Sequence, residues 1–168
     1  RSVWRTEDAE AGLAAARRIA ARAKEQDGDV GDQASAVDDV ARLLSGMGRM
    51  LECVGIDSAA LVFVDQHTEF PLNRRGLARQ RLAQDYAAMG DHERALKYYL
   101  DARSVYEKCV PQPGLNLADA CNGAGSACWH LGRTREAEAY YKQALAHLEK
   151  TSDPRRNFRL ASTVANMG

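Results

Sequence analysis

The sequence has no excess of either charge. Its 168 residues contain 23 Lys plus Arg and 23 Asp plus Glu, so the formal net charge at pH 7 is zero. Domains that bind a nucleic-acid backbone or an anionic membrane surface usually carry a basic surplus or a basic patch. The balance gives no electrostatic reason for either, and we expect neither nucleic acid nor a membrane as partner.

Long hydrophobic runs are also missing. No stretch approaches the roughly 18 apolar residues that a membrane-spanning helix needs. The chain is nevertheless 45% hydrophobic and 27% charged, which is typical of a globular domain with a core and not of a disordered tail. Its length is sufficient for one such domain.

Cysteines are few, and none is placed as in a metal-binding motif. They are Cys53, Cys109, Cys121 and Cys128; none forms a CxxC pair or has a histidine at zinc-finger spacing. Cys121 and Cys128 share one face of a helix, where a thiol behaves as a small hydrophobic group. We expect buried free thiols and therefore a reducing, cytoplasmic environment.

Recognisable catalytic motifs are absent. The sequence contains no HExxH, no GxSxG and no paired-acid signature. Asp65, His67 and Glu69 could share a metal ion on a strand, but on a helix they point in different directions. The run "GAGSAC", Gly123 to Cys128, lacks the lysine and hydroxyl of a phosphate-binding loop. His92 is placed like a neighbour of a helix cap. We predict no catalytic residue, no cofactor and no metal.

What the sequence does contain is an internal repeat. "LAQDYAAMGDHERALKYYLDA", Leu82 to Ala102, and "AGSACWHLGRTREAEAYYKQA", Ala124 to Ala144, have the same length and the same central glycine. Gly168 ends the first half of a further copy, and a faded copy surrounds Gly55. A period of 20 to 50 residues is typical of arrays of stacked helical hairpins.

Small and aromatic residues recur after each central glycine at steps of four and three, which places them on one face of a helix. They are Ala95, Tyr99, Ala102, Tyr106 and Cys109 in one copy and Ala137, Tyr141, Ala144 and Leu148 in the next. We expect the alanines to meet small residues of the preceding helix (Ala83, Gly125), and the tyrosines to fill the space toward the next unit.

Helix ends are marked as well. Gly90 and Gly132 are suited to helix C-caps, because glycine adopts positive φ without a steric penalty. Asp91 and Thr134 are predicted N-caps of the helices that follow. Asp153 with Pro154 is a typical helix start.

These residues resemble the tetratricopeptide repeat, whose helix–turn–helix units carry small residues, an aromatic and a central glycine at this spacing. The large aromatic expected early in the first helix is replaced by Arg79 and Cys121. The 42-residue step from Gly90 to Gly132 and the run "EAEAYYKQAL" are most similar to repeats of the kinesin-light-chain type. The resemblance implies an all-α, right-handed α-solenoid of antiparallel helical hairpins.

The repeat pattern divides the chain. Residues 1–38 are expected to form an N-terminal helix, which would suit the second half of a repeat, and an acidic loop; residues 39–168 are expected to form the array. A weak repeat spans 41–69, clear repeats span 76–110 and 118–150, and a further first helix spans 154–168. Leu61–Val64 could be a strand, but its place in the weak repeat favours a helix.

First helices line the concave face of such an array. Trp129 could anchor a partner or pack between repeats, and Arg155 and Arg159 could bind a carboxylate or simply face water. Amides suit a peptide backbone. The predicted partner-binding residues are Gln80, Gln84, Asn122, Ser126, Trp129, His130, Arg155, Phe158 and Arg159, with Arg49, Glu52, Ala88 and Ser162 also facing inward.

Some tetratricopeptide domains hold a partner's C-terminal carboxylate with Lys, Asn and Arg residues. Arg155 and Arg159 match the last members of that set, but Gln80, Gln84 and Gly123 replace the earlier ones. The resemblance therefore implies a non-enzymatic scaffold that binds another peptide or helical segment, acidic near Arg155. Homo-oligomerisation is compatible with the sequence but not indicated by it.

An alternative is a sensor or regulatory module within a larger signalling enzyme or transcription regulator. The sequence begins with Arg and ends in mid-pattern, as a fragment of a longer protein would, and its acidic loop also leaves this alternative open. A metal-dependent enzyme that uses His67 is the weakest reading.

Overall fold

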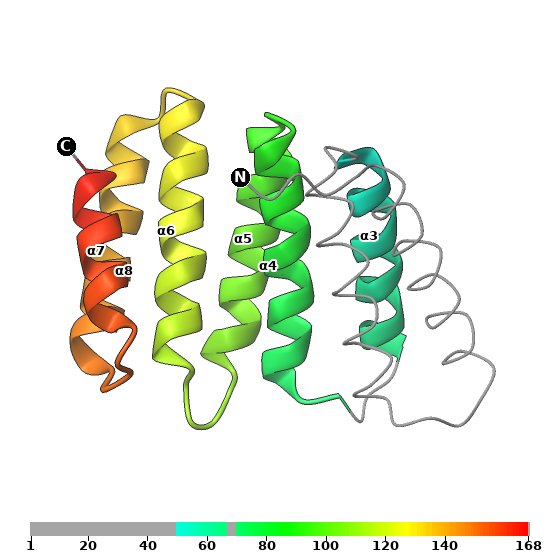
Figure 1. The fold of residues 1–168 in the computed structure, drawn as a ribbon, viewed down its shortest axis with the longest axis horizontal. Helices are drawn as coiled ribbons and strands as arrows, with labels where there is room; N and C mark the ends of the chain where they lie inside the picture. The colour runs from blue at the N-terminus through cyan, green and yellow to red at the C-terminus, as the bar shows by residue number, and fades with distance from the viewer. Residues whose placement is uncertain (1–49, 67–69, 168) are drawn as a thin grey trace, which may run out of the picture. The chain divides into compact units, whose positions relative to one another are not determined.

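The computed structural model describes residues 50–66 and 70–167, and all regular elements in these ranges are helices (Figure 1). The all-α class is therefore confirmed. The helices are α3 (Met50–Gln66), α4 (Leu72–Ala88), α5 (His92–Glu107), α6 (Gly114–His130), α7 (Thr134–Lys150) and α8 (Arg156–Ala165). Leu61–Val64 lies within α3, as a helix and not a strand. The helix and loop expected within residues 1–38 lie outside the described ranges.

The chain divides into two compact units, Arg1–Val62 and Phe63–Gly168. In the second unit, α4 packs with α5 and α6 packs with α7 as antiparallel hairpins, α5 packs on α6, and α8 packs mainly on α7. Figure 1 shows α4, α6 and α8 in one layer, with α5 and α7 behind them. The two hairpins span residues 72–107 and 114–150. The repeat bounds of 76–110, 118–150 and 154–168 stay predictions.

Gly90 and Gly132 end the first helix of each hairpin with positive φ angles of 80° and 73°. After α4, the N–H of Gly90 donates to the carbonyl of Ala87, and the N–H of Asp91 donates to that of Tyr86. Gly132 repeats this pattern after α6. This is the Schellman arrangement, in which a left-handed residue lets the turn satisfy the last helical carbonyls.

Replacing Gly132 with alanine is expected to lower the free energy of unfolding by about 1 kcal/mol, because a Cβ disfavours the left-handed conformation. Gly132→Asn is the control, since asparagine tolerates that region better and should lose less. Urea unfolding followed by circular dichroism measures both. An alanine variant as stable as the parent would contradict the role of positive φ at this turn.

The helix starts agree with the sequence in part. The carboxylate of Asp91 accepts a hydrogen bond from the N–H of Arg94 at 3.1 Å, so this N-cap is confirmed. Thr134 is not an N-cap: the Schellman turn delivers the chain into α7 at Arg133, and Thr134 is already the first helical residue. Asp153 accepts from the N–H of Arg155 at 2.9 Å, in the turn just before α8.

The alanine stripes are buried as expected, with Ala95 and Ala102 of α5 and Ala137 and Ala144 of α7 at most 1% exposed. Tyr99 and Tyr141 are buried too. Glycines of the first helices lie directly against tyrosine rings, and a Cβ at any of them would overlap the ring: Gly76 against Tyr106, Gly123 against Tyr99, and Gly125 against Tyr141.

These contacts refine the expected packing. Tyr99 lies on α5 and Gly123 on α6, so this contact joins one hairpin to the next, as expected for the tyrosine. It also accounts for glycine at position 123, in the middle of α6, where a larger residue would meet the ring. The nearest side chain to Gly125 is that of Tyr141 and not that of Ala137.

None of the four cysteines forms a disulfide, and all four are buried, as expected. Burial raises the pKa of Cys121 to about 11 and also raises those of Cys109 and Cys128. These three side chains are therefore protonated thiols at neutral pH and poor nucleophiles.

Candidate functional site

The surface of interest is formed by the first helix of each hairpin, α4 and α6, and by α8. We call it the first-helix face. Its members are Gln84 and Ala88 of α4, Asp119, Asn122 and Ser126 of α6, and Arg159, Ser162 and Asn166 of α8 and its C-cap. Gln84 and Ala88 are exposed, and Ser126 and Ser162 are half-buried. The row carries amides and hydroxyls, which suit hydrogen bonding to a peptide backbone.

Gln80 does not belong to this face, and its assignment to the open surface was wrong. Its side chain is buried, and its Oε1 accepts a hydrogen bond from the hydroxyl of Tyr106 at 3.1 Å. A buried amide that is already hydrogen-bonded supports the α4–α5 hairpin and is not available to a partner.

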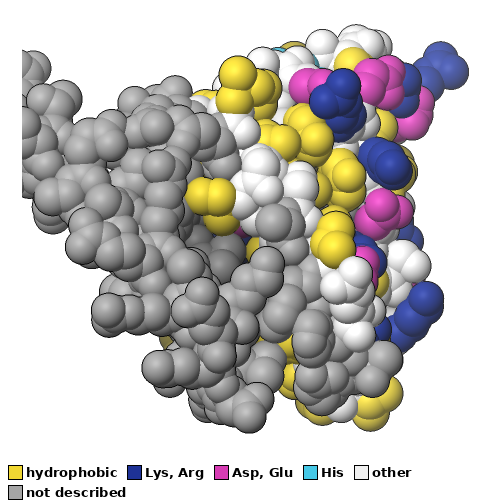
Figure 2. Space-filling model, turned by 90° about the vertical axis from the view of Figure 1, so that its right-hand side faces the viewer, with side chains coloured by type: hydrophobic (Ala, Val, Ile, Leu, Met, Phe, Trp, Pro, Cys, Tyr) yellow, Lys and Arg dark blue, Asp and Glu magenta, His cyan; other side chains and the backbone are white. Residues whose placement is uncertain are grey.

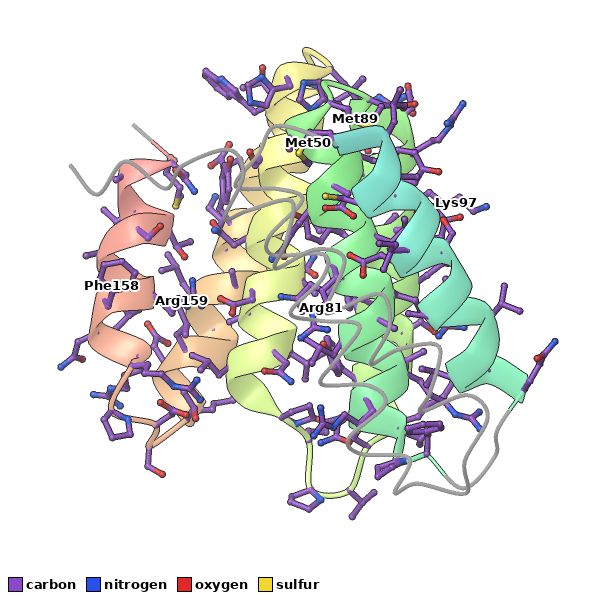
Figure 3. All side chains as sticks on the ribbon, turned by 45° about the vertical axis from the view of Figure 1, so that its right-hand side comes forward. Met50, Arg81, Met89, Lys97, Phe158 and Arg159 are labelled. Atoms are coloured by element: carbon purple, nitrogen blue, oxygen red, sulfur yellow. The ribbon has the colours of Figure 1, made fainter. Side chains whose placement is uncertain are left out.

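Two polar contacts connect α6 to α8 across the first-helix face. The guanidinium of Arg159 lies 3.1 Å from the carboxylate of Asp119, and the amide of Asn166 donates to that of Asn122 at 3.2 Å. Figure 3 shows Arg159 on the side of α8 that faces the neighbouring helices. Two of the predicted partner-binding residues, Asn122 and Arg159, are thus already engaged within the chain.

Asp119 is a member of the face that the sequence reading missed. Burial raises its pKa, while the charges of Arg159 and Arg155 lower it. Its charge also acts on Tyr99, whose pKa is raised to about 12 mainly by burial and further by Asp119. The signal was present, because Asp119 precedes Ser126 by two helical turns and so shares its face.

Arg155 and Phe158 are placed differently from Arg159. Arg155 forms a two-pronged ion pair with Asp153, with N–O distances of 3.0 and 2.8 Å, and its hydrogen bonds lower the pKa of Asp153 to about 2. Phe158 is 74% exposed and lies on the other side of α8 from Arg159 (Figure 3). It does not share the contact that Arg159 makes with α6, and its place in the partner-binding set stays a prediction.

Trp129 and His130 lie at the end of α6, where the turns of the two hairpins meet. The ring of His130 stacks on that of His92, with centroids 4.3 Å apart and planes 8° from parallel. Arg133 and Glu93 form an ion pair at 2.6 Å beside them. His130 therefore joins the hairpins at this edge, whereas Trp129 remains 55% exposed.

Metal binding gains no support from the described residues. Parallel imidazoles direct their in-plane lone pairs along parallel lines, so His92 and His130 as placed do not converge on one ion. No group of three or more His, Cys, Asp or Glu suited to a metal occurs within residues 50–66 and 70–167. Asp65 pairs with Arg79 at 2.8 Å. His67 and Glu69 lie outside the described residues.

Ser126 and the weak repeat complete the predicted set. Burial raises the pKa of Tyr141, and a hydrogen bond with Ser126 lowers it, so this serine lies at the tyrosine hydroxyl. Arg49 and the side chain of Glu52 are outside the described part of the chain. Among the described helices, none is long and apolar enough to cross a bilayer.

Charges of both signs are mixed on the surface. Figure 2 shows Lys and Arg side chains interspersed with Asp and Glu over the described part of the visible face. Within α7, Lys142 pairs with Glu138 at 2.6 Å, and within α5, Arg103 pairs with Glu107 at 2.8 Å. Such exposed pairs contribute little to stability and create no field of one sign.

The geometry defines a class: a helical-repeat protein of antiparallel hairpins with glycine-capped first helices. The family model described as tetratricopeptide repeat matches residues 73–150, the span from the start of α4 to the end of α7. These residues are therefore similar to tetratricopeptide repeats. A comparison with curated protein sequences finds no match.

Solved structures show the same fold. BtubC (BKLC) from P. vanneervenii superposes with a TM-score of 0.80 at 21% identity, over 95% of this chain and 64% of that one. This chain thus spans less than two thirds of BtubC. A Podosopora anserina protein, described as a kinesin light chain with nearly identical TPR-like repeats, gives a TM-score of 0.70 at 18% identity. That match covers 96% of this chain and 76% of the other. The likeness to kinesin-light-chain-type repeats is thus confirmed for the fold.

Proposed function

We propose that the chain is a non-enzymatic scaffold that binds a peptide or helical segment of a partner protein on its first-helix face. Tetratricopeptide repeats generally mediate protein–protein interaction, and the observation that carries the proposal here is the row of amides and hydroxyls on the first helices, in which Gln84 is exposed. Gln84 and Ser126 lie in corresponding positions of successive repeats, with the exposed indole of Trp129 at the end of α6. An exposed indole of this kind is a frequent anchor in protein interfaces.

The ion pairs affect the partner chemistry expected from the sequence. An acidic segment was expected near Arg155 and Arg159, but both arginines are already paired with carboxylates of this chain. The proposal therefore depends on the amide and hydroxyl row and on Trp129, and not on a free cationic patch. The cytoplasmic location expected from the unpaired cysteines is retained as part of the proposal.

A charged side chain placed on the first-helix face should weaken the capture of partners. Ala88→Arg is expected to reduce recovery of bound proteins from a cell extract about tenfold, because it puts a buried charge into the interface. Ala146→Arg is the matched control, since Ala146 is an equally exposed alanine on α7. Recovery is quantified by mass spectrometry on immobilised chain. Loss with Ala146→Arg and not with Ala88→Arg would place binding on the opposite layer.

The alternative, a regulatory module of a larger enzyme or transcription regulator, uses the same surface toward a domain of its own polypeptide. This alternative is supported by the length of the structural relatives, because BtubC extends well beyond the part that this chain matches. The complete reading frame distinguishes the two: an adjoining catalytic or DNA-binding sequence would favour the module.

A further inference from the structure

We propose that Asp119 binds a lysine or arginine side chain of the partner segment, which takes the place now held by Arg159. This inference rests on the proposed function, because it names the chemistry that the first-helix face selects. The observation is a carboxylate on that face that is paired, within the described residues, with a cation of α8. The guanidinium of Arg159 thus shows what this position accepts.

The burial of the two partners is unequal. The side chain of Asp119 is 19% exposed and that of Arg159 is 42% exposed. Separating a pair is costly mainly for the member that stays buried without a counter-charge. An incoming cation keeps Asp119 paired and releases Arg159 toward water, where a guanidinium is well solvated. An incoming anion at Arg159 would instead leave the more buried carboxylate without a partner.

Arg159 is also the easier member to move. Of the residues of α8, Thr163 is the one that is buried, whereas Phe158 and Val164 are exposed. Asp119 stands in α6, whose neighbours Leu117, Ala118 and Ala120 are at most 1% exposed. The carboxylate of Asp119 therefore has a fixed position. The guanidinium of Arg159 belongs to a more exposed side chain, on a helix that is less buried.

Other ionisable groups also lie near Asp119. Tyr99 and Tyr106 lie close enough for its charge to raise their pKa values beyond the effect of burial. Arg155 also acts on Asp119, but its own guanidinium is held by Asp153 through two hydrogen bonds. Among the charged groups described on this face, the pair of Asp119 and Arg159 is thus the one that a ligand can open by displacing a single contact.

Two substitutions should change the affinity for a basic peptide in opposite directions. Asp119→Asn removes the charge that would hold the ligand cation, so it should weaken binding of a basic peptide about tenfold. Arg159→Gln removes the internal competitor and should tighten binding several-fold. If the partner were acidic, both signs would be reversed, since Asp119 would then be the competitor and Arg159 the binding group.

The experiment selects ligands from a phage-displayed library of random 12-residue peptides on the immobilised 168-residue chain. Recovered peptides are synthesised, and their affinities are measured by fluorescence anisotropy for the parent, Asp119→Asn, Arg159→Gln and Ala88→Arg. Glu138→Gln is the matched control, because it neutralises an exposed carboxylate that is also paired with a cation, on α7. Circular dichroism melting curves establish that each variant is folded.

Peptides enriched in Lys or Arg that show the two opposite effects, with no change for Glu138→Gln, would support the inference. Three outcomes would overturn the inference but leave the proposed function standing, because the peptides still lose binding with Ala88→Arg. The peptides are acidic, or they bind more weakly to both Asp119→Asn and Arg159→Gln, or their affinity changes with neither substitution. If no recovered peptide depends on Ala88, the proposed function fails, and this inference fails with it.

Discussion

Replacing Tyr106 with alanine should lower the free energy of unfolding by about 3–5 kcal/mol, the largest loss expected for any single side chain here. Tyr106 is fully buried in a cluster with Ala102, Cys109, Leu117 and Ala120, so its removal opens a cavity between α5 and α6. Its ring also covers Gly76 of α4. The same residue therefore holds its own hairpin together and joins that hairpin to the next.

The loss has a separable polar part. Tyr106→Phe keeps the ring but leaves the buried Oε1 of Gln80 without its donor, which should cost about 1–3 kcal/mol. Tyr140→Ala is the control, since Tyr140 is half-buried on α7 and should cost less. Urea unfolding followed by circular dichroism gives all three values. Equal losses for Tyr106→Ala and Tyr140→Ala would contradict the central place of Tyr106 in the core.

The backbone of the fold could be predicted because it depends on local chemistry. Gly90 and Gly132 are needed where φ is positive, and that requirement is visible in a sequence as a glycine after an apolar period. The stripe of Ala95, Tyr99 and Ala102 indicates which face of the second helix is buried, since helical periodicity fixes the face without knowledge of the neighbour. Both features were confirmed.

The site could be predicted less well because its members depend on distant residues. Gln80 has the spacing of a face residue, yet it is buried because Tyr106, 26 positions later, reaches it from the end of α5. Arg159 appeared to be a free cation until the fold placed Asp119 beside it from another helix. Periodicity gives the direction of a side chain, but it does not give the partner that another helix brings there.

The failed N-cap shows the same limit on a smaller scale. Threonine is a good capping residue, and Thr134 follows a helix-ending glycine at a plausible distance. The hydrogen bond from the N–H of Arg133 to the carbonyl of Cys128 closes the turn one residue earlier, so α7 begins at Thr134 itself. Such turns decide at which residue a helix begins. Residue preferences alone predict that position only to within one or two residues.

Replacing Gly123 with alanine should destabilise the second unit by about 2 kcal/mol or more. Alanine normally stabilises a helix relative to glycine by about 1 kcal/mol, but here its Cβ would overlap the ring of Tyr99. Overpacking of a buried contact typically costs 1–3 kcal/mol, and Tyr99 is itself 7% exposed and enclosed by the two hairpins. The contact should therefore reverse the usual sign of the substitution.

Gly55→Ala provides the matched control, because Gly55 also lies within a helix but an added Cβ would find no atom within 4 Å. Gly55→Ala should raise the free energy of unfolding by up to about 1 kcal/mol. Since Gly55 lies in the other unit, amide hydrogen exchange resolved by helix is the suitable measurement: faster exchange in α5 and α6 for Gly123→Ala, slower exchange in α3 for Gly55→Ala. Stabilisation by both alanines would mean that Tyr99 does not close on Gly123, and that the hairpins meet through other contacts.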